Sequence, residues 1–117
     1  ADSIVAGLPR DRNKALRAAR ETGGAYVRVS DAEILAGIPA LARGCGVFAE
    51  PAAAAAYAGL IKALEQEFVT SEERVVVLAT GSGLKDVASV MKAVETEPPV
   101  VSPEFEAVRH SIGERGA

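Results

Sequence analysis

The stretch from Val75 to Asp86 constrains the fold of this chain more than any other part of its sequence. It opens with an unbroken apolar run, Val75 to Ala79, which is typical of a strand buried on both faces of a parallel sheet. Thr80-Gly81-Ser82-Gly83 then predicts a turn. Apolar residues recur with helical spacing after the turn, and they are Leu84, Val87, Ala88, Met91 and Val94. We therefore expect the turn to join the carboxyl end of a strand to the amino end of a helix, where open α/β sheets bind ligands through free amides.

Helices are expected before this stretch. Residues 11–22 form an amphipathic pattern that Gly23-Gly24 ends, and a capping box at Ser30–Glu33 starts a second helix that Gly44-Cys45-Gly46 ends. A third helix opens at Glu50-Pro51, with proline at its first position. Residues 84–95 form a fourth, and a short helix is expected near 105–110. Residues 25–29 alternate in polarity and predict a short strand, and residues 1–8 predict a strand or an extended entry.

The same patterns predict which side chains are buried. In the second helix the expected inward residues are Ile34, Leu35, Ile38 and Leu41. In the third helix they form a stripe of larger side chains, namely Tyr57, Leu60, Ile61, Leu64 and Phe68. The run Ala52–Ala56 before that stripe predicts a smooth surface that another backbone can approach closely.

The order of these elements predicts an α/β fold, a three-layer Rossmann-like parallel sheet with flanking helices. Two clear strands rarely make a stable sheet, and a strand as apolar as Val75–Ala79 needs neighbours on both sides. We therefore expect this chain to hold part of a sheet whose other strands lie in missing sequence or in a partner.

Composition excludes several functions. A chain of 117 residues is long enough for one domain, and its formal net charge of -3 does not favour nucleic acid. No apolar run reaches transmembrane length and no secretory signal is recognised, so no membrane partner is expected. The lone Cys45 cannot form an internal disulfide, which fits a cytoplasmic protein. Gly81-Ser82-Gly83 lacks the third glycine of a dinucleotide fingerprint, and one histidine with one cysteine cannot build a zinc site.

Three motifs resemble those of one enzyme family. They are Ala1-Asp2-Ser3-Ile4, Gly46-Val47-Phe48-Ala49-Glu50-Pro51-Ala52 and Thr80-Gly81-Ser82-Gly83-Leu84-Lys85-Asp86. In this order they resemble the C-terminal part of threonine synthases, pyridoxal-phosphate lyases of fold type II (tryptophan synthase β-like). The last motif is fairly specific to threonine synthases, whereas Glu50-Pro51-Ala52 is shared across the superfamily. The resemblance implies amino-acid biosynthesis, the conversion of O-phospho-L-homoserine and water to L-threonine and phosphate.

The resemblance also implies roles for single residues. Thr80 would place its hydroxyl near the pyridine nitrogen of pyridoxal 5'-phosphate, Gly81 would adjoin it, and Glu50 would lie near the edge of the ring. Ser3, with Asp2, would line the cofactor side of the cleft. The family's Schiff-base lysine lies upstream of anything in this chain, so no catalytic residue is expected here and the chain alone should be inactive. The implied partners are the N-terminal part of the same enzyme and, in some assemblies, further copies.

Alternatives remain at this stage. Residues 1–97 are expected to be the C-terminal portion of the catalytic domain, and residues 98–117 an extended or short-helical tail. A threonine or serine dehydratase would share the fold, although Leu84-Lys85-Asp86 favours threonine synthase. A third hypothesis, of a different functional class, is a non-catalytic binding module that retains part of the fold. Without the motifs, Thr80 is the polar end of a strand and Glu50 a helix-start residue.

Overall fold

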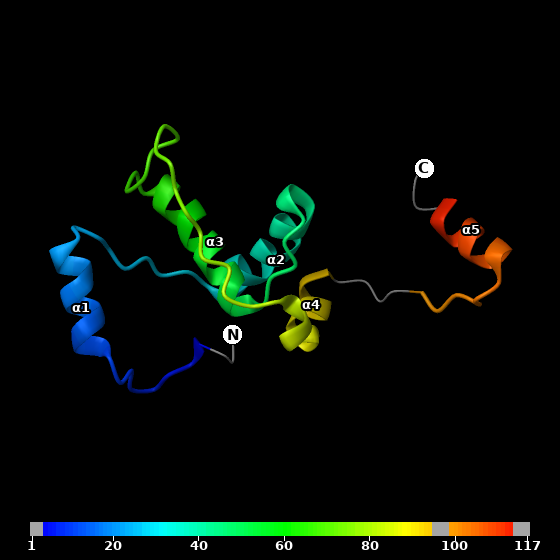
Figure 1. Cartoon of the computed structure of the whole chain (residues 1–117), viewed down its shortest axis with the longest axis horizontal. Coiled ribbons are helices and arrows are strands. Elements are labelled where there is room, and N and C mark those ends of the chain that lie inside the picture. The colour runs from blue at the N-terminus through cyan, green and yellow to red at the C-terminus, as the bar shows by residue number, and fades with distance from the viewer. Residues whose placement is uncertain (1–3, 95–98, 114–117) are drawn as a thin grey trace.

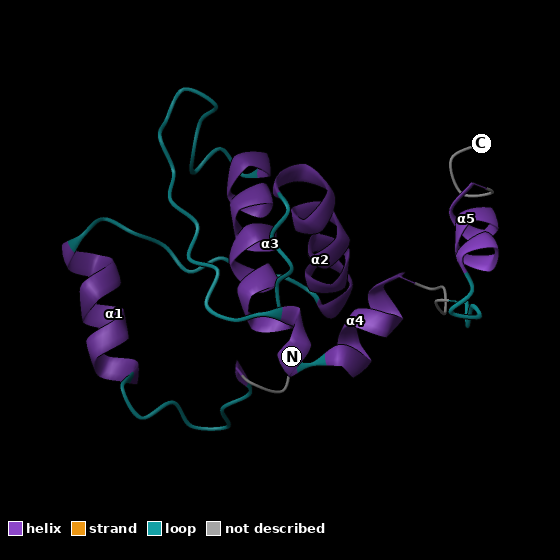
Figure 2. Cartoon of the chain, turned by 45° about the vertical axis from the view of Figure 1, so that its right-hand side comes forward, coloured by secondary structure: helices purple, strands orange, loops and turns teal. Residues whose placement is uncertain are grey.

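The structure, a computed structural model, describes residues 4–94 and 99–113 (Figure 1). Its elements are α1 (Arg12–Glu21), α2 (Asp31–Cys45), α3 (Pro51–Glu65), the 3-10 helix η2 (Gly83–Lys85), α4 (Val87–Val94) and α5 (Phe105–Gly113). Helices α2 and α3 pack side by side, and α4 packs on α2. Figures 1 and 2 show α1 and α5 set apart from this α2–α3–α4 cluster. No helix within these residues is long and apolar enough to span a bilayer.

The predicted starts of α2 and α3 and the glycine ends of α1 and α2 are confirmed. The Ser30 hydroxyl accepts the Glu33 amide at the start of α2, and the Glu33 carboxylate accepts the Ser30 amide at 2.6 Å. Gly46 follows α2 in the left-handed region with φ of 71°, and Gly23 follows α1 with φ of 66°. Pro51 occupies the first turn of α3, where its missing N–H costs nothing.

The core of the cluster lies between α2, α3 and α4, and consists of Ile34, Ile38, Ala54 and Val90. Gly37 of α2 lies directly on α3, because a Cβ at this position would be only 3.3 Å from the carbonyl oxygen of Ala54. The alanine run of α3 therefore allows the close approach that the sequence predicts. Leu35 and Leu41 are half-buried, so the inward face of α2 is confirmed most firmly at Ile34 and Ile38.

The larger apolar stripe predicted for α3 is half-buried at Tyr57 and Leu60 and wrong at its other three positions. Ile61 and Leu64 are 40% and 39% exposed, and Phe68 lies beyond the end of the helix and is 60% exposed. The buried residues of α3 are Pro51, Ala53, Ala54, Ala58 and Ala63. The close contact at Gly37 is made by Ala54 and by the ring of Tyr57, so the interface takes the small side chains and one end of the stripe.

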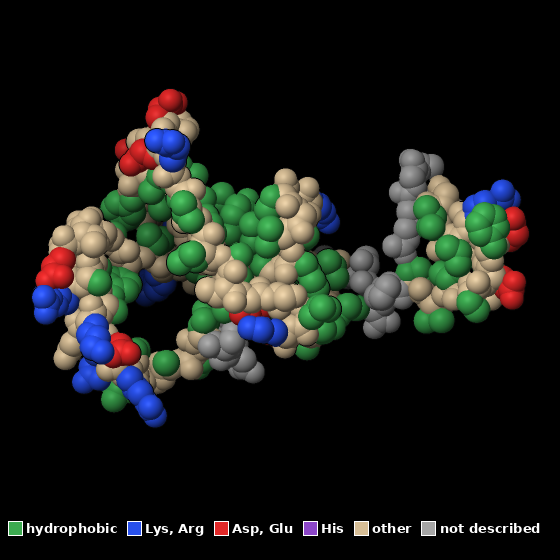
Figure 3. Space-filling view, viewed as in Figure 1, with side chains coloured by type: hydrophobic (Ala, Val, Ile, Leu, Met, Phe, Trp, Pro, Cys, Tyr) green, Lys and Arg blue, Asp and Glu red, His purple; other side chains and the backbone are tan. Residues whose placement is uncertain are grey.

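The predicted parallel sheet is not found in the described part of the chain. Residues 25–29 and 75–79 form no strand there, and Figure 2 draws both as loops. Residues 4–8, expected to be extended or a strand, also form none, and residues 1–3 lie outside the described range. Val76 and Leu78 are 86% and 73% exposed, and Figure 3 shows many hydrophobic side chains open on one face. A strand is stabilised by pairing, and no described segment offers its backbone to residues 75–79.

The helix predicted over 84–95 starts later and buries another face. The chain first makes the turn η2, and α4 begins at Val87 after Asp86, whose carboxylate accepts the Ser89 amide at 3.0 Å. Val90 is buried, whereas Leu84 and Val87 of the predicted inward face are 75% and 51% exposed. The short helix expected near 105–110 is confirmed as α5, while the boundary placed at residue 97 lies outside the described residues.

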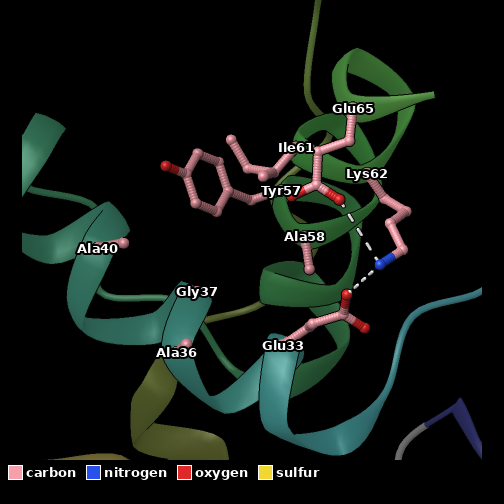
Figure 4. Close-up of a pocket in the computed structure, with 9 residues that line it drawn as sticks. All are labelled: Glu33, Ala36, Gly37, Ala40, Tyr57, Ala58, Ile61, Lys62 and Glu65. Carbon is pink, nitrogen blue, oxygen red and sulfur yellow. Dashed lines mark hydrogen bonds and ion pairs between the residues drawn. The ribbon is translucent and has the colours of Figure 1, made fainter. Parts of the chain in front are cut away.

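An ion pair joins α2 to α3 beside a small cavity. Lys62 donates to Glu33 at 2.6 Å and lies 3.6 Å from Glu65 (Figure 4). Tyr57 and Ile61 line the same cavity of about 220 Å³. The bond from Lys62, followed by the bonds from Ser30, lowers the pKa of Glu33 from an ordinary 4.5 to about 2.

The pH dependence of stability should change in Glu33→Gln. The folded state holds the Glu33 proton more weakly than the unfolded state, so the pair stabilises above pH 4.5 and its contribution is lost as the pH falls towards 2. Glutamine retains the capping box and removes this dependence. We expect the urea midpoint of the 117-residue chain to fall less between these pH values in the variant than in the wild type.

Glu65→Gln is the matched control for this measurement. It removes the same charge from a carboxylate that is 60% exposed and 3.6 Å from Lys62. Exposed pairs of this kind contribute little, so the control should keep the acid dependence of the wild type. Equal acid profiles for wild type and Glu33→Gln would contradict the prediction.

Candidate functional site

Two of the three motifs meet at the amino end of α3. The Glu50 amide donates to the Gly81 carbonyl at 3.0 Å, and the Gly83 amide donates to the Phe48 carbonyl at 3.0 Å. Between these bonds Ala49 lies opposite Ser82 as an isolated antiparallel bridge. We call residues 48–50 and 81–83 the motif bridge. It contains Glu50 and Gly81 and directly follows Thr80, so three of the four residues that the sequence assigns to the site lie at or beside it.

The two glycines of the motif bridge allow the side chains of Glu50 and Phe48 to approach closely. A Cβ on Gly81 would overlap the carboxylate of Glu50, and a Cβ on Gly83 would lie 2.5 Å from Cε2 of Phe48. Neither glycine adopts the left-handed backbone that the structure gives Gly23 and Gly46. The backbone conformation at both positions therefore suits alanine, and only the added Cβ would clash.

Glu50 is the buried charged residue of the site, with 6% of its surface exposed. It precedes α3 and makes no side-chain cap hydrogen bond. Within residues 4–94 and 99–113 its carboxylate has no hydrogen bond or ion pair. A carboxylate so placed lies near the positive end of the α3 dipole and packs against the Gly81 backbone.

Thr80 is exposed at the end of a segment without regular structure and directly precedes the motif bridge. Among the described residues no hydrogen bond engages its hydroxyl. A free hydroxyl here can donate or accept one bond to a ligand. Ser3, the fourth predicted site residue, lies outside the described residues, as does Asp2.

The amides after the turn are not free to bind a ligand as the sequence predicted. The Leu84 amide donates to the Ser82 hydroxyl at 3.3 Å, and the Lys85 and Asp86 amides donate to the Ser82 and Gly83 carbonyls. Asp86 in turn caps α4, and bonds from the Ser89 side chain and then its backbone hold the pKa of Asp86 below its ordinary value. The 3-10 turn thus uses internally the donors that a longer helix would have left open.

Phe48 belongs to the site and was missed as a single residue by the sequence reasoning. Its ring covers Gly83, directly across the motif bridge. The signal was the matching spacing of two motifs, large residues at 48 and 50 and glycines at 81 and 83. Because side chains alternate along extended backbone, an antiparallel pairing of 49 with 82 puts all four on one face.

The chain matches known proteins along most of its length. The family model described as "Pyridoxal-phosphate dependent enzyme" matches residues 1–81. A threonine synthase from Methanosarcina acetivorans is 43% identical over 112 residues, which are 96% of this chain and 27% of that protein. One from Mycobacterium tuberculosis H37Rv is 40% identical over 86% of this chain and 28% of its own length.

A threonine synthase from Synechocystis sp. PCC 6803 is also 40% identical, over 97% of this chain and 29% of its own length. The chain thus spans less than a third of the length of these curated relatives. The family model covers the motif bridge up to Gly81, together with α1, α2 and α3. The chain therefore belongs to the family of pyridoxal-phosphate-dependent enzymes.

Proposed function

We propose that this chain is the C-terminal part of a threonine synthase, which converts O-phospho-L-homoserine and water to L-threonine and phosphate. The observation that carries the proposal is the identity of about 40% to named threonine synthases over nearly the whole chain. The direct contact between the Glu50 and Thr80 motifs supports it, because a cofactor site needs both motifs close together.

The residues at the motif bridge fit one side of a pyridine ring. Thr80 offers an exposed hydroxyl, and the buried carboxylate of Glu50 packs against Gly81 beside it. We assign the hydroxyl of Thr80 to the ring nitrogen, and Gly81, Glu50 and Ser3 to the lining of the cofactor site. Pyridoxal phosphate supplies an electron sink when bound. A neutral hydroxyl, in place of a carboxylate, holds the ring nitrogen less protonated and tempers that sink.

The rest of the site comes from the upstream part of the enzyme in this proposal. The lysine that binds the cofactor covalently and the loop that holds its phosphate both lie there, so the 117-residue chain alone is inactive. Residues 1–97 complete the catalytic domain and residues 98–117 form a tail. The exposed Val76 and Leu78 support a further step, in which residues 75–79 join a parallel sheet built with upstream strands. We place the enzyme in the cytoplasm, which the single cysteine supports, and propose further copies of the enzyme as partners.

Titration with pyridoxal phosphate tests the proposal. Absorbance is followed for this chain alone and for the complete enzyme, meaning this chain together with the upstream part of its gene product. We expect the visible band of bound cofactor only in the complete enzyme, and phosphate release when O-phospho-L-homoserine is added. Formation of a 2-oxo acid from threonine, with no release of phosphate, would assign the protein to the dehydratases. A complete enzyme that never binds the cofactor would leave the binding-module alternative.

A further inference from the structure

We propose that Phe48 and Glu50 are positioning residues that hold the turn carrying Thr80, by filling the side-chain space of Gly83 and Gly81. The functional part of this inference rests on the cofactor role proposed for Thr80. The packing on which it is built does not.

The pairing across the motif bridge sets which residues face each other. With Ala49 opposite Ser82, Phe48 lies opposite Gly83 and Glu50 opposite Gly81. Both backbone bonds between these pairs are 3.0 Å long. A single bridge with two bonds is a small amount of pairing, since isolated short pairings are marginal in water. Side chains that cover the glycines add the packing that this bridge otherwise lacks, as cross-strand aromatic–glycine pairs do.

The contacts leave no room for a side chain at Gly83 or Gly81 while Phe48 and Glu50 stay in place. A Cβ on Gly83 would lie 2.5, 2.6 and 2.8 Å from three atoms of the Phe48 ring, whereas carbon atoms pack at about 3.5–4.0 Å. The ring is 41% exposed, so it can relieve the overlap only by swinging away from the turn. Glu50 is 6% exposed, and its carboxylate has still less room to leave Gly81.

Thr80 gains its position from this arrangement. Its own hydroxyl makes no hydrogen bond within the described residues, and the segment before it, residues 74–80, forms no regular structure. The first fixed point next to Thr80 is the Gly81 carbonyl, held by the Glu50 amide. Displacing Phe48 or Glu50 therefore moves the Thr80 hydroxyl relative to any ligand bound beside it.

The experiment uses the complete enzyme and compares Gly83→Ala, Phe48→Ala and the double variant. Hydrogen exchange of the peptide 80–86 is measured without cofactor, and the affinity for pyridoxal phosphate is measured separately. We expect Gly83→Ala to speed exchange and to weaken cofactor affinity, each by about tenfold, a usual size for contacting residues. In the Phe48→Ala background the same change should have at most about a twofold effect, because the overlap is gone.

A second pair and a control complete the design. Gly81→Ala should speed exchange and weaken cofactor affinity both in the wild type and in Glu50→Gln, whose side chain has about the same volume. In Glu50→Ala the same change should have little effect on either readout. Gly59→Ala in α3 is the matched control, because nothing lies within 4 Å of its Cβ, and it should leave both readouts unchanged.

The outcomes separate this inference from the proposed function. Equal effects of Gly83→Ala with and without Phe48 would overturn the inference. The inference would also be overturned if the effects of Gly83→Ala and Phe48→Ala on exchange were coupled but no variant changed cofactor affinity. Phe48 would then have a structural role only. If the unmodified complete enzyme binds no pyridoxal phosphate, the proposed function fails. The positioning role falls with it, while the exchange rates still report on the packing.

Discussion

Thr80→Val should abolish most of the activity of the complete enzyme while leaving its stability unchanged. Valine keeps the branched shape of threonine and removes only the hydroxyl. The hydroxyl has no hydrogen-bond partner among the described residues, so no internal bond is lost. If it meets the ring nitrogen, we expect kcat/KM to fall by about 100-fold, as when one preorganised polar contact is removed from an active site. Phosphate release from O-phospho-L-homoserine measures the rate, and thermal unfolding measures the stability.

Thr80→Ser is the control, because it keeps a hydroxyl at the same position and should retain most of the rate. The absorbance band of the bound cofactor should shift in Thr80→Val and stay in place in Thr80→Ser. A Thr80→Val enzyme within twofold of the wild type would exclude the contact assigned to this hydroxyl. Loss of rate in both variants would mean that the methyl group of Thr80 is needed as well as its oxygen.

Ile38→Ala should be the most destabilising single change in the α2–α3–α4 cluster. Ile38 is 1% exposed and is the largest side chain that is fully buried in the described residues. Truncation to alanine leaves a cavity that Ala54 and Val90 cannot fill, and such changes cost about 2–5 kcal/mol. This is a large share of the ~5–15 kcal/mol that stabilises a typical domain. Urea unfolding of the 117-residue chain, followed by far-ultraviolet circular dichroism, gives the change directly.

Ile112→Ala is the matched control for this prediction. It makes the same truncation on α5, where the side chain is 68% exposed and outside the cluster. Exposed substitutions usually change stability by less than about 0.5 kcal/mol. Equal shifts for the two variants would show that the cluster is not the stabilising core.

The sequence by itself determined the features that depend on neighbours along the chain. The capping box at Ser30, the left-handed glycines after α1 and α2, and Pro51 at the start of α3 each act within one turn of helix. Their effects need no tertiary partner, so these helix ends follow from the residues present. The motifs also indicate the family, because the order of Ser3, Glu50 and Thr80 can be read from the sequence without knowledge of the fold.

Only the tertiary structure decided the features that depend on residues far apart in the chain. Which face of α3 is buried depends on Gly37 of α2, which admits Ala54 and the ring of Tyr57. The strand expected at 75–79 needs backbone partners that no described segment provides. The pairing of Phe48 with Gly83 and of Glu50 with Gly81 is visible only once Ala49 meets Ser82. Local propensity sets where a helix begins and ends, whereas burial and pairing are set by the surfaces that the rest of the fold presents.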